Sequence, residues 1–182
     1  WCVVHSLWQL EAIEQAVLSK PITVWLKLDS GMHRVGLHPK DYPAAYQRLL
    51  AIGKVAKIVL ISHFARADEL HAQSSAEQVA VFEAARQGLA AEVSLRNSPA
   101  VLGWPEIQSD WVRPGIMLYG ATPFEEVNAV AERLQPVMTL ESKVISVREL
   151  PAGEPIGYGA RFITDKPMRI GVVAMGYADG YP

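Results

Sequence analysis

Residues 21–31, PITVWLKLDSG, contain a β-branched and aromatic run between the helix-breaking Pro21 and the turn-forming Asp29-Ser30-Gly31. This pattern predicts a strand over 22–28 that ends in a loop. The stretches VAKIVLI at 55–61 and VSL at 93–95 repeat the apolar run further along the chain. The three strands begin about 33 and about 38 residues apart, which is the spacing of consecutive βα units with a parallel sheet.

Stretches with apolar residues at helical spacing lie between these strands: 6–19, 42–52 and 74–89. A strand-like run at 2–4 precedes the first helix, which begins with a capping box of Ser6 and Gln9. A fifth strand is predicted over 116–119. No GxGxxG motif follows any strand, which favours a (β/α)8 barrel over a dinucleotide-binding sheet. The prediction is an α/β fold whose strands form part of a TIM-type barrel.

The composition changes beyond about position 125. A charged stretch over 125–134 predicts a helix, and the apolar and polar residues that mix over 137–149 predict β structure. We therefore expect a division into 1–125, the C-terminal part of a barrel, and 126–182, the beginning of a mainly β domain. The chain also starts on an apolar run instead of a polar terminus, from which we expect an internal fragment of a longer protein.

The overall composition favours a globular protein that acts on small molecules. Half of the residues (50%) are hydrophobic, 20% are charged, and the net charge is -2. A balance of this kind gives no broad electrostatic footprint for nucleic acid or for a membrane surface. The single cysteine, Cys2, excludes an intrachain disulfide and a cysteine-rich metal site, so we expect a reducing, cytoplasmic location and no bound metal.

Polar side chains follow the predicted strands where the active sites of barrels lie. They are Lys27 and Arg34 around the second strand, His63 after the third, Asn97 and Ser98 after the fourth, and Arg113 before the fifth. In Arg113-Pro114-Gly115-Ile116 the glycine lets backbone N–H groups approach a ligand, and Ser98 adds a hydroxyl, so together they form a candidate phosphate cup.

A structural interpretation stays open for each of these residues. Taken singly, an arginine or lysine such as Arg34 or Lys27 is more often a solvated surface charge, and a histidine such as His63 is more often structural. Asn97-Ser98 can equally be a helix cap. Tyr158, between two glycines, either exposes its hydroxyl to a ligand or marks a bent strand. The tyrosines of the segment 176–182, Tyr177 and Tyr181, either line an entrance or pack against the protein.

Six segments, in order along essentially the whole chain, resemble one family, the alanine racemases of bacteria. They are LKLDSGMHRVGL (26–37), HFARADE (63–69), RNSPAVLGWP (96–105), DWVRPGIMLYGATP (110–123), GYGARF (157–162) and GYADGYP (176–182). The resemblance implies a pyridoxal 5'-phosphate enzyme that joins a (β/α)8 barrel to a C-terminal β domain. The amino-acid sequences of these motifs most resemble those of the enterobacterial biosynthetic form.

The resemblance also implies roles at the matching positions. Tyr158 resembles the tyrosine base that exchanges the α-proton of the substrate, and in the family the partner subunit of a homodimer supplies this base. Arg113 resembles the arginine that faces the pyridine nitrogen of the cofactor, and His63 resembles the histidine that links this arginine to the tyrosine. Arg34 is similar to the arginine at the cofactor's phenolic oxygen and near the substrate carboxylate. Lys27 is similar to the lysine that is often carbamylated and orients that arginine.

The remaining matches concern the phosphate and the entrance. Ser98, Gly115 and Ile116 resemble the phosphate cup of the family, and Asn97 adjoins it. Tyr177 resembles a tyrosine at the entrance to the substrate site. These residues complete the binding set that the resemblance implies for the cofactor and for alanine.

Racemisation explains why such residues are needed. A proton leaves one face of the α-carbon and another returns to the opposite face, so two bases must bracket a planar intermediate. A free tyrosine has a pKa of about 10, and a cationic arginine acting through His63 would favour the Tyr158 phenolate. An arginine, with a pKa above ~12, hardly gives up its proton, so Arg113 would leave the pyridine nitrogen largely unprotonated and limit side reactions such as transamination.

The second base of the family, the lysine that holds the cofactor as a Schiff base, has no match in this chain. The lysines stand in segments that do not resemble its motif: Lys20, Lys27, Lys40, Lys54, Lys57, Lys143 and Lys166. We therefore expect a parent enzyme that interconverts L- and D-alanine and supplies D-alanine for peptidoglycan, and a fragment that is inactive alone. The alternatives are another barrel-type pyridoxal phosphate enzyme, such as an amino-acid decarboxylase, or a noncatalytic module that binds phosphate ligands or self-associates.

Overall fold

A computed structural model describes residues 1–180 of the chain; Tyr181, and with it the end of the segment 176–182, lies outside the described residues. The chain packs as two units, Trp1–Val137 and a second unit from Met138 onward. Residues beyond 125 still belong to the first unit, because Ala131 is buried and the Val137 N–H donates to the Tyr119 carbonyl at 3.3 Å. The domain boundary between 125 and 126 stays a prediction.

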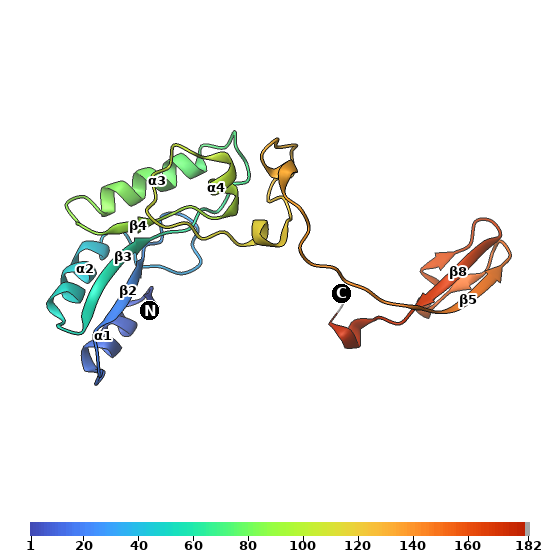
Figure 1. The fold of residues 1–182 in the computed structure, drawn as a ribbon, viewed down its shortest axis with the longest axis horizontal. Helices are drawn as coiled ribbons and strands as arrows, with labels where there is room; N and C mark the ends of the chain where they lie inside the picture. The colour runs from blue at the N-terminus through green and yellow to red at the C-terminus, as the bar shows by residue number, and fades with distance from the viewer. Residues whose placement is uncertain (181–182) are drawn as a thin grey trace. The chain divides into compact units, whose positions relative to one another are not determined.

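The first unit is built on a parallel sheet whose strands follow one another in the order β1-β2-β3-β4 (Figure 1). Their bounds are Cys2–Val4, Ile22–Lys27, Val55–Ile61 and Glu92–Ser94. Since side chains alternate between the faces of a strand, the register places Leu26, Leu60 and Val93 side by side on one face. All three are buried in the core, and the expected α/β class with a parallel sheet is confirmed.

Helices cover that face of the sheet. Their bounds are α1, Leu7–Gln15; α2, Tyr42–Ala51; α3, Ser74–Ala85; and α4, Ser98–Gly103. Leu10 of α1, Tyr42 of α2 and Phe82 of α3 are each 0% exposed and belong to the same core as the strand residues. Burying one such side chain stabilises a fold by about 1.5–3 kcal/mol, so this layer fixes the strands and the loops that follow them.

The opposite face of the sheet carries an aromatic cluster, Trp1, Trp25 and Trp111. Their ring centroids lie 5.7 to 6.0 Å apart. Lys57 from β3 stands 5.4 Å from the centroid of the Trp111 ring, and its Nζ lies 2.7 Å from Glu92 Oε1. By strand alternation Lys27 shares this face with Trp25, so the face that a barrel would turn inward holds one of the predicted site residues.

Two predicted elements of the first unit are wrong. Residues 116–119 form a 3₁₀ helix, not a strand, with Leu118 N–H donating to Gly115 O and left-handed Gly120 ending it. The free edge of β4 is instead used by earlier residues, since the Asp110 and Trp111 N–H groups donate to Val93 O. The predicted helix over 125–134 is reduced to a 3₁₀ turn at Ala131–Arg133.

The predicted helix ends also need correction. The first helix stops at Gln15 instead of about position 19, and α3 stops at Ala85 instead of about 89. The capping box does not form, because Gln9 Oε1 accepts from the His5 N–H at 2.8 Å and the Ser6 side chain makes no cap bond. The Gln9 side chain therefore pairs with the N–H group of His5, one residue before the expected Ser6, and satisfies an unpaired N–H group at the start of the helix.

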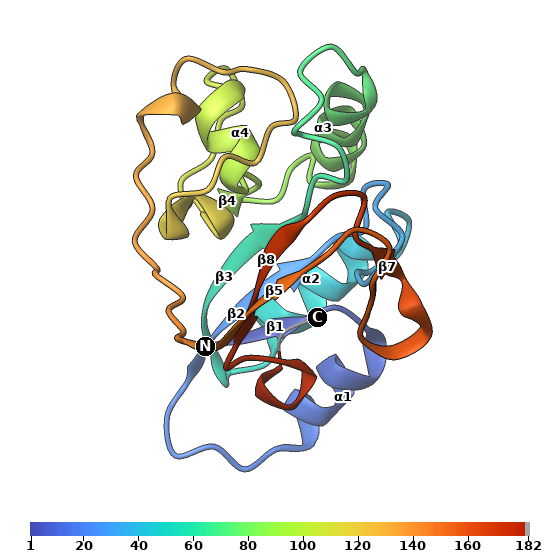
Figure 2. The same cartoon turned by 90° about the vertical axis from the view of Figure 1, so that its right-hand side faces the viewer.

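The second unit consists of two antiparallel strand pairs, and its expected β character is confirmed. Strand β5, Val144–Leu150, pairs with β8, Met168–Val173, and both are drawn in orange to red in Figure 2. Strand β6, Pro155–Ile156, pairs with β7, Phe162–Ile163. The buried Thr164 hydroxyl closes this small hairpin by donating to Pro151 O at 2.7 Å and accepting from the Glu154 N–H at 2.8 Å.

None of the helices within residues 1–180 is both long enough and apolar enough to cross a membrane.

Candidate active site

The carboxyl ends of three neighbouring strands lie level with one another. The register pairs Lys27, the last residue of β2, with Ile61 of β3, and Ile61 with Ser94, the last residue of β4. Because parallel strands end at the same edge, the residues that follow them, including His63, are delivered to one place.

The Arg113 guanidinium bridges the ends of β3 and β4. Its Nη1 donates to the carbonyl and hydroxyl oxygens of Ser94, at 2.7 and 2.6 Å, and its Nη2 donates to the carbonyl of Ser62 at 2.5 Å. The same Nη2 lies 3.4 Å from His63 Nδ1. Because three of these contacts use the planar fork of the guanidinium, the orientation of Arg113 is fixed by the backbone of the sheet.

Burial, together with neighbouring positive charges, lowers pKa values at this edge. Burial, followed by the charges of Arg113, Lys27 and Arg34, lowers the pKa of His63 to about 4. Burial and the charges of Arg113 and Arg34, opposed by Asp29, lower the pKa of Lys27 to about 8, and burial lowers the pKa of Arg113. His63 is therefore a neutral imidazole near pH 7. If its Nδ1 accepts from Arg113, its proton resides on Nε2.

Ser98 forms the floor of the predicted phosphate cup. Its side chain is buried, and its Oγ accepts from the N–H groups of Gly115, at 2.8 Å, and Met117, at 3.4 Å. Asn97 caps α4, since its Oδ1 accepts from the Ala100 N–H at 3.2 Å. The structural interpretation of Asn97 as a cap is correct, and the same cap places Ser98 opposite Gly115.

The surroundings of Gly115 fit a phosphate group. A Cβ added to this residue would meet only Ser98 Oγ, at 3.9 Å, within 4 Å. Ile116 follows it and is about half exposed. The open space beside the Gly115 backbone, next to a hydroxyl whose hydrogen can still donate, suits a phosphate oxygen, so these residues fit the phosphate of pyridoxal phosphate.

Arg34 lies on a loop that only glycine can close. The Leu37 N–H donates to Lys27 O at 2.8 Å, and a Cβ on Gly36, at φ 144, would come within 2.4 Å of the Asp29 nitrogen. The Asp29 carboxylate accepts from the N–H groups of Gly31 and His33, both at 3.0 Å. The Arg34 side chain is exposed, and its charge reaches His63 and Lys27 through the pKa effects above.

Tyr158 and Tyr177 lie in the second unit. Tyr158 begins a 3₁₀ turn flanked by Gly157 and Gly159, both at positive φ, and its ring is fully exposed. Tyr177 begins a second such turn and is 94% exposed. The structure thus brings together the predicted residues of the first unit, and it presents these two tyrosines on a unit of their own.

Sequence reasoning missed a buried polar group beneath His63. Ser30 and Ser62 have their hydroxyl oxygens 2.7 Å apart, and Gln78 of α3 reaches both Ser30 and the backbone around His63. One signal was available: Gln78 stands between Ser75 and Phe82 on the buried side of α3. A glutamine in such a position needs partners, because buried amides are almost always hydrogen-bonded.

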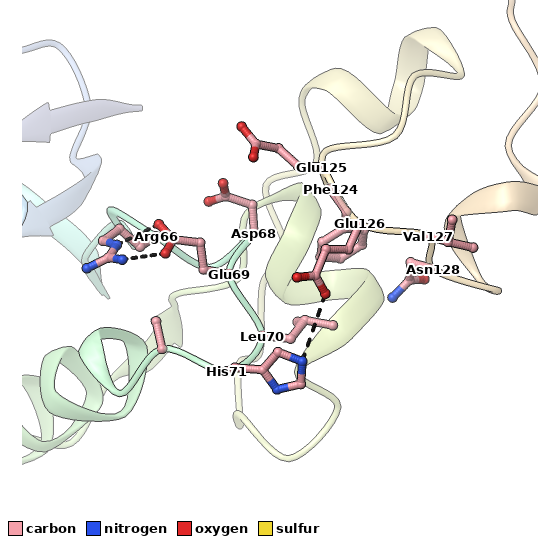
Figure 3. Close-up of a pocket in the computed structure, with 11 residues that line it drawn as sticks. Arg66, Asp68, Glu69, Leu70, His71, Phe124, Glu125, Glu126, Val127 and Asn128 are labelled. Carbon is pink, nitrogen blue, oxygen red and sulfur yellow. Dashed lines mark hydrogen bonds and ion pairs between the residues drawn. The ribbon is translucent and has the colours of Figure 1, made fainter.

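A cavity of about 500 Å³ lies elsewhere in the first unit, between the segments 66–72 and 124–128 (Figure 3). It contains an ion pair between Arg66 and Glu69, and His71 Nε2 lies 3.9 Å from Glu126 Oε2. No predicted site residue lines it. Its charged side chains are largely exposed, so it offers none of the desolvated groups that catalysis uses.

Two family models match the chain: alanine racemase, N-terminal domain, over residues 1–123, and alanine racemase, C-terminal domain, over 137–182. An alanine racemase of Pseudomonas fluorescens is 85% identical over all 182 residues, and a catabolic alanine racemase of Pseudomonas putida is 78% identical over the same length. The crystal structure of the biosynthetic alanine racemase from Pseudomonas aeruginosa matches 99% of the chain with a TM-score of 0.91 and 46% identity, and 50% of that structure is covered. The chain spans about half (51%) of the length of the curated relatives it matches.

Proposed function

Because the chain belongs to the alanine racemase family, we propose that the whole protein interconverts L-alanine and D-alanine with pyridoxal 5'-phosphate. The observation that carries this proposal is the Arg113 guanidinium, held at the strand ends beside His63. The family resemblance gives both groups a role in racemisation: Arg113 faces the pyridine nitrogen of the cofactor, and His63 links Arg113 to the tyrosine base.

The cofactor would be held by its two ends. The phosphate would lie against Ser98, Gly115 and Ile116, with Asn97 as the cap that sets the position of Ser98, and Arg113 would donate to the pyridine nitrogen. Pyridoxal phosphate supplies the electron withdrawal that makes the α-proton of a bound amino acid acidic. An arginine partner, which hardly releases its proton, tempers that withdrawal.

The protein's own groups then move the proton. We propose that the Tyr158 phenol exchanges it on one face of the α-carbon and that the base for the other face is a lysine outside these residues. Tyr158 would come from the partner subunit of a homodimer, and Tyr177 would line the entrance. His63, neutral at pH 7, would connect Arg113 to Tyr158 by its two ring nitrogens. The 182-residue chain alone would then be inactive.

Arg34 and Lys27 would hold the substrate side of the site. Arg34 would pair with the substrate carboxylate and the phenolic oxygen of the cofactor. Lys27, with its pKa lowered to about 8, is a candidate for carbamylation, since a neutral amine is the form that takes up carbon dioxide. The carbamate would replace one of three crowded cations with an anion and so orient Arg34.

The identity values favour a second physiological role beside the supply of D-alanine for peptidoglycan. The relative named catabolic is 78% identical to the chain, whereas the structure named biosynthetic is 46% identical. These values do not favour the expected likeness to a biosynthetic form. A role in alanine degradation is therefore the second candidate, and the reaction is the same in both.

In the test, these 182 residues replace the matching segment of the Pseudomonas fluorescens relative. We call the product the grafted enzyme. Racemisation of L-alanine is followed by circular dichroism, with the variants Arg113→Ala and, as a control, the exposed Arg161→Ala. We expect activity in the grafted enzyme and in the control, and a loss of about 100-fold or more in kcat for Arg113→Ala. A grafted enzyme that binds pyridoxal phosphate without racemising alanine would refute the proposal and leave the decarboxylase or binding-module alternatives.

A further inference from the structure

The side chain of Gln78 is a buried clamp on the segment that contains His63. It is 4% exposed, and it comes from α3, which does not otherwise belong to the candidate active site. Its Nε2 donates to the His63 carbonyl at 2.9 Å, and its Oε1 accepts from the Ala65 N–H at 2.9 Å. The amide thus holds the backbone on both sides of Phe64, and Phe64 is buried in the core.

The same amide also connects His63 to the neighbouring loop. Gln78 Nε2 lies 3.3 Å from Ser30 Oγ, which lies 2.7 Å from Ser62 Oγ, and Ser62 Oγ donates to Leu28 O at 2.9 Å. Ser30 belongs to the turn that leads to Arg34. A Cβ on Gly31 would press within 3.3 Å of the Gln78 side chain, so the turn is shaped to admit this amide.

The network continues to the arginine of the site. Ser62 provides the hydroxyl in the centre of the network, and its carbonyl accepts from Arg113 Nη2 at 2.5 Å. His63 therefore has two supports: the Arg113 contact at its ring and the Gln78 contact at its backbone. The serine and glutamine hydrogen bonds together fix the distance between these supports.

We propose that Gln78 is a positioning residue for the reaction: through the His63 carbonyl, the Ala65 N–H and Ser30, it holds the His63 ring in line with Arg113 and keeps the Arg34 turn beside it. The inference rests on the proposed racemase function and concerns a residue that touches neither cofactor nor substrate.

If the position of Gln78 served only to fill space in the core, an apolar side chain of the same size would stabilise the fold at least as well. The amide instead makes three polar contacts, and a fully satisfied buried network specifies one arrangement of the loops that it joins. Displacing a reacting group by about 1 Å can cost about 100-fold in rate. Loss of the clamp should therefore be visible in catalysis even where the fold persists.

The test compares three variants of the grafted enzyme with pyridoxal phosphate bound. Gln78→Met removes both hydrogen-bonding ends at similar size, Gln78→Glu keeps the acceptor for the Ala65 N–H but loses the amide donor, and Gln87→Met is the control, just beyond α3 and exposed. The measurements are kcat per bound cofactor, KM for alanine and the thermal midpoint. We expect kcat to fall about 10- to 100-fold in Gln78→Met, KM to change by less than about threefold, and Gln87→Met to match the unsubstituted enzyme.

A purely structural role would lower the thermal midpoint and leave kcat per bound cofactor within about twofold, and that result would overturn the inference. If Gln78→Met does not fold, Gln78→Glu decides by the same criterion. Arg113→Ala in parallel separates the two proposals. If Arg113→Ala is inactive while Gln78→Met and Gln78→Glu are fully active, only the role of Gln78 fails; if the unsubstituted grafted enzyme is inactive, the proposed function fails.

Discussion

Lys27 is the residue whose ordinary chemistry the fold changes most usefully. Its pKa falls from 10.5 to about 8 because burial and the neighbouring Arg113 and Arg34 disfavour the ammonium. At about pH 8, the Lys27 amine is therefore neutral and nucleophilic in about half of the molecules. We expect the grafted enzyme, in ¹³C-bicarbonate, to give a carbamate resonance that Lys27→Met removes and Lys57→Met leaves in place. A resonance that survives in Lys27→Met would exclude this residue as the modified lysine.

His63 offers a pH dependence of known sign. Burial and the positive charges of Arg113, Lys27 and Arg34 lower its pKa from 6.5 to about 4. As the pH falls below 6.5, the unfolded chain binds this proton before the folded one, so stability is lost between pH 6.5 and about 4. In an NMR titration of the grafted enzyme without cofactor, the ring signal that His63→Gln removes should titrate near 4, and Arg113→Met should raise its pKa without restoring 6.5. A midpoint near 6.5 in the unsubstituted protein would contradict this.

At the scale of elements, helix α4 depends on its cap. Asn97 Oδ1 accepts from the Ala100 N–H, and the next residue, Ser98, is the floor of the phosphate cup. Replacing an N-cap asparagine by alanine costs about 1 kcal/mol, whereas serine is an equally good cap. We expect Asn97→Ala to lower the thermal midpoint of the grafted enzyme and to weaken pyridoxal phosphate binding several-fold, with Asn97→Ser close to the unsubstituted protein. If the unsubstituted protein and both variants bind pyridoxal phosphate equally well, the Asn97 cap does not contribute to the phosphate cup.

The elements that the sequence predicts correctly are those whose ends are marked by local helix-breaking or turn-forming residues. Pro21 marks the start of strand β2, and the turn-forming residues 29–31 mark its end. Both signals are local to the strand. Residues 116–119 have the apolar composition of a short buried strand, which periodicity cannot distinguish from other structures in so few residues. Their backbone has no strand to pair with, because residues 110–113 occupy the edge of β4 first, and this competition is a tertiary fact that the local sequence does not contain.

At the scale of the whole molecule, parallel strands explain how much of the site could be predicted. Once the strands are known, the rule that their carboxyl ends share an edge brings Lys27 and His63 together. Arg113 reaches the same edge by another route, because residues 110–113 run along β4, and the rule does not describe that segment. The rule says nothing about Gln78, which enters from the side of a helix, because its role depends on which loop the helix happens to cover. It is also silent on Tyr158, whose place depends on a unit and a proposed partner that strand order does not describe.

The division of the chain into two units makes a last prediction about the chain itself. The first unit ends at Val137, and residues 138–141 are exposed and belong to no helix or strand. Exposed segments of this kind are the preferred sites of proteolysis, whereas strand and helix backbone is protected. Brief trypsin treatment of the 182-residue chain should cut first at Arg133 or Lys143, which flank this segment, and intact mass should show the two resulting pieces. The double variant Arg133→Gln and Lys143→Gln should slow that first cleavage, and Arg161→Gln should not. Early cleavage at Lys27 or Lys57, which lie within β2 and β3, would instead mean that the parallel sheet does not form in the chain alone.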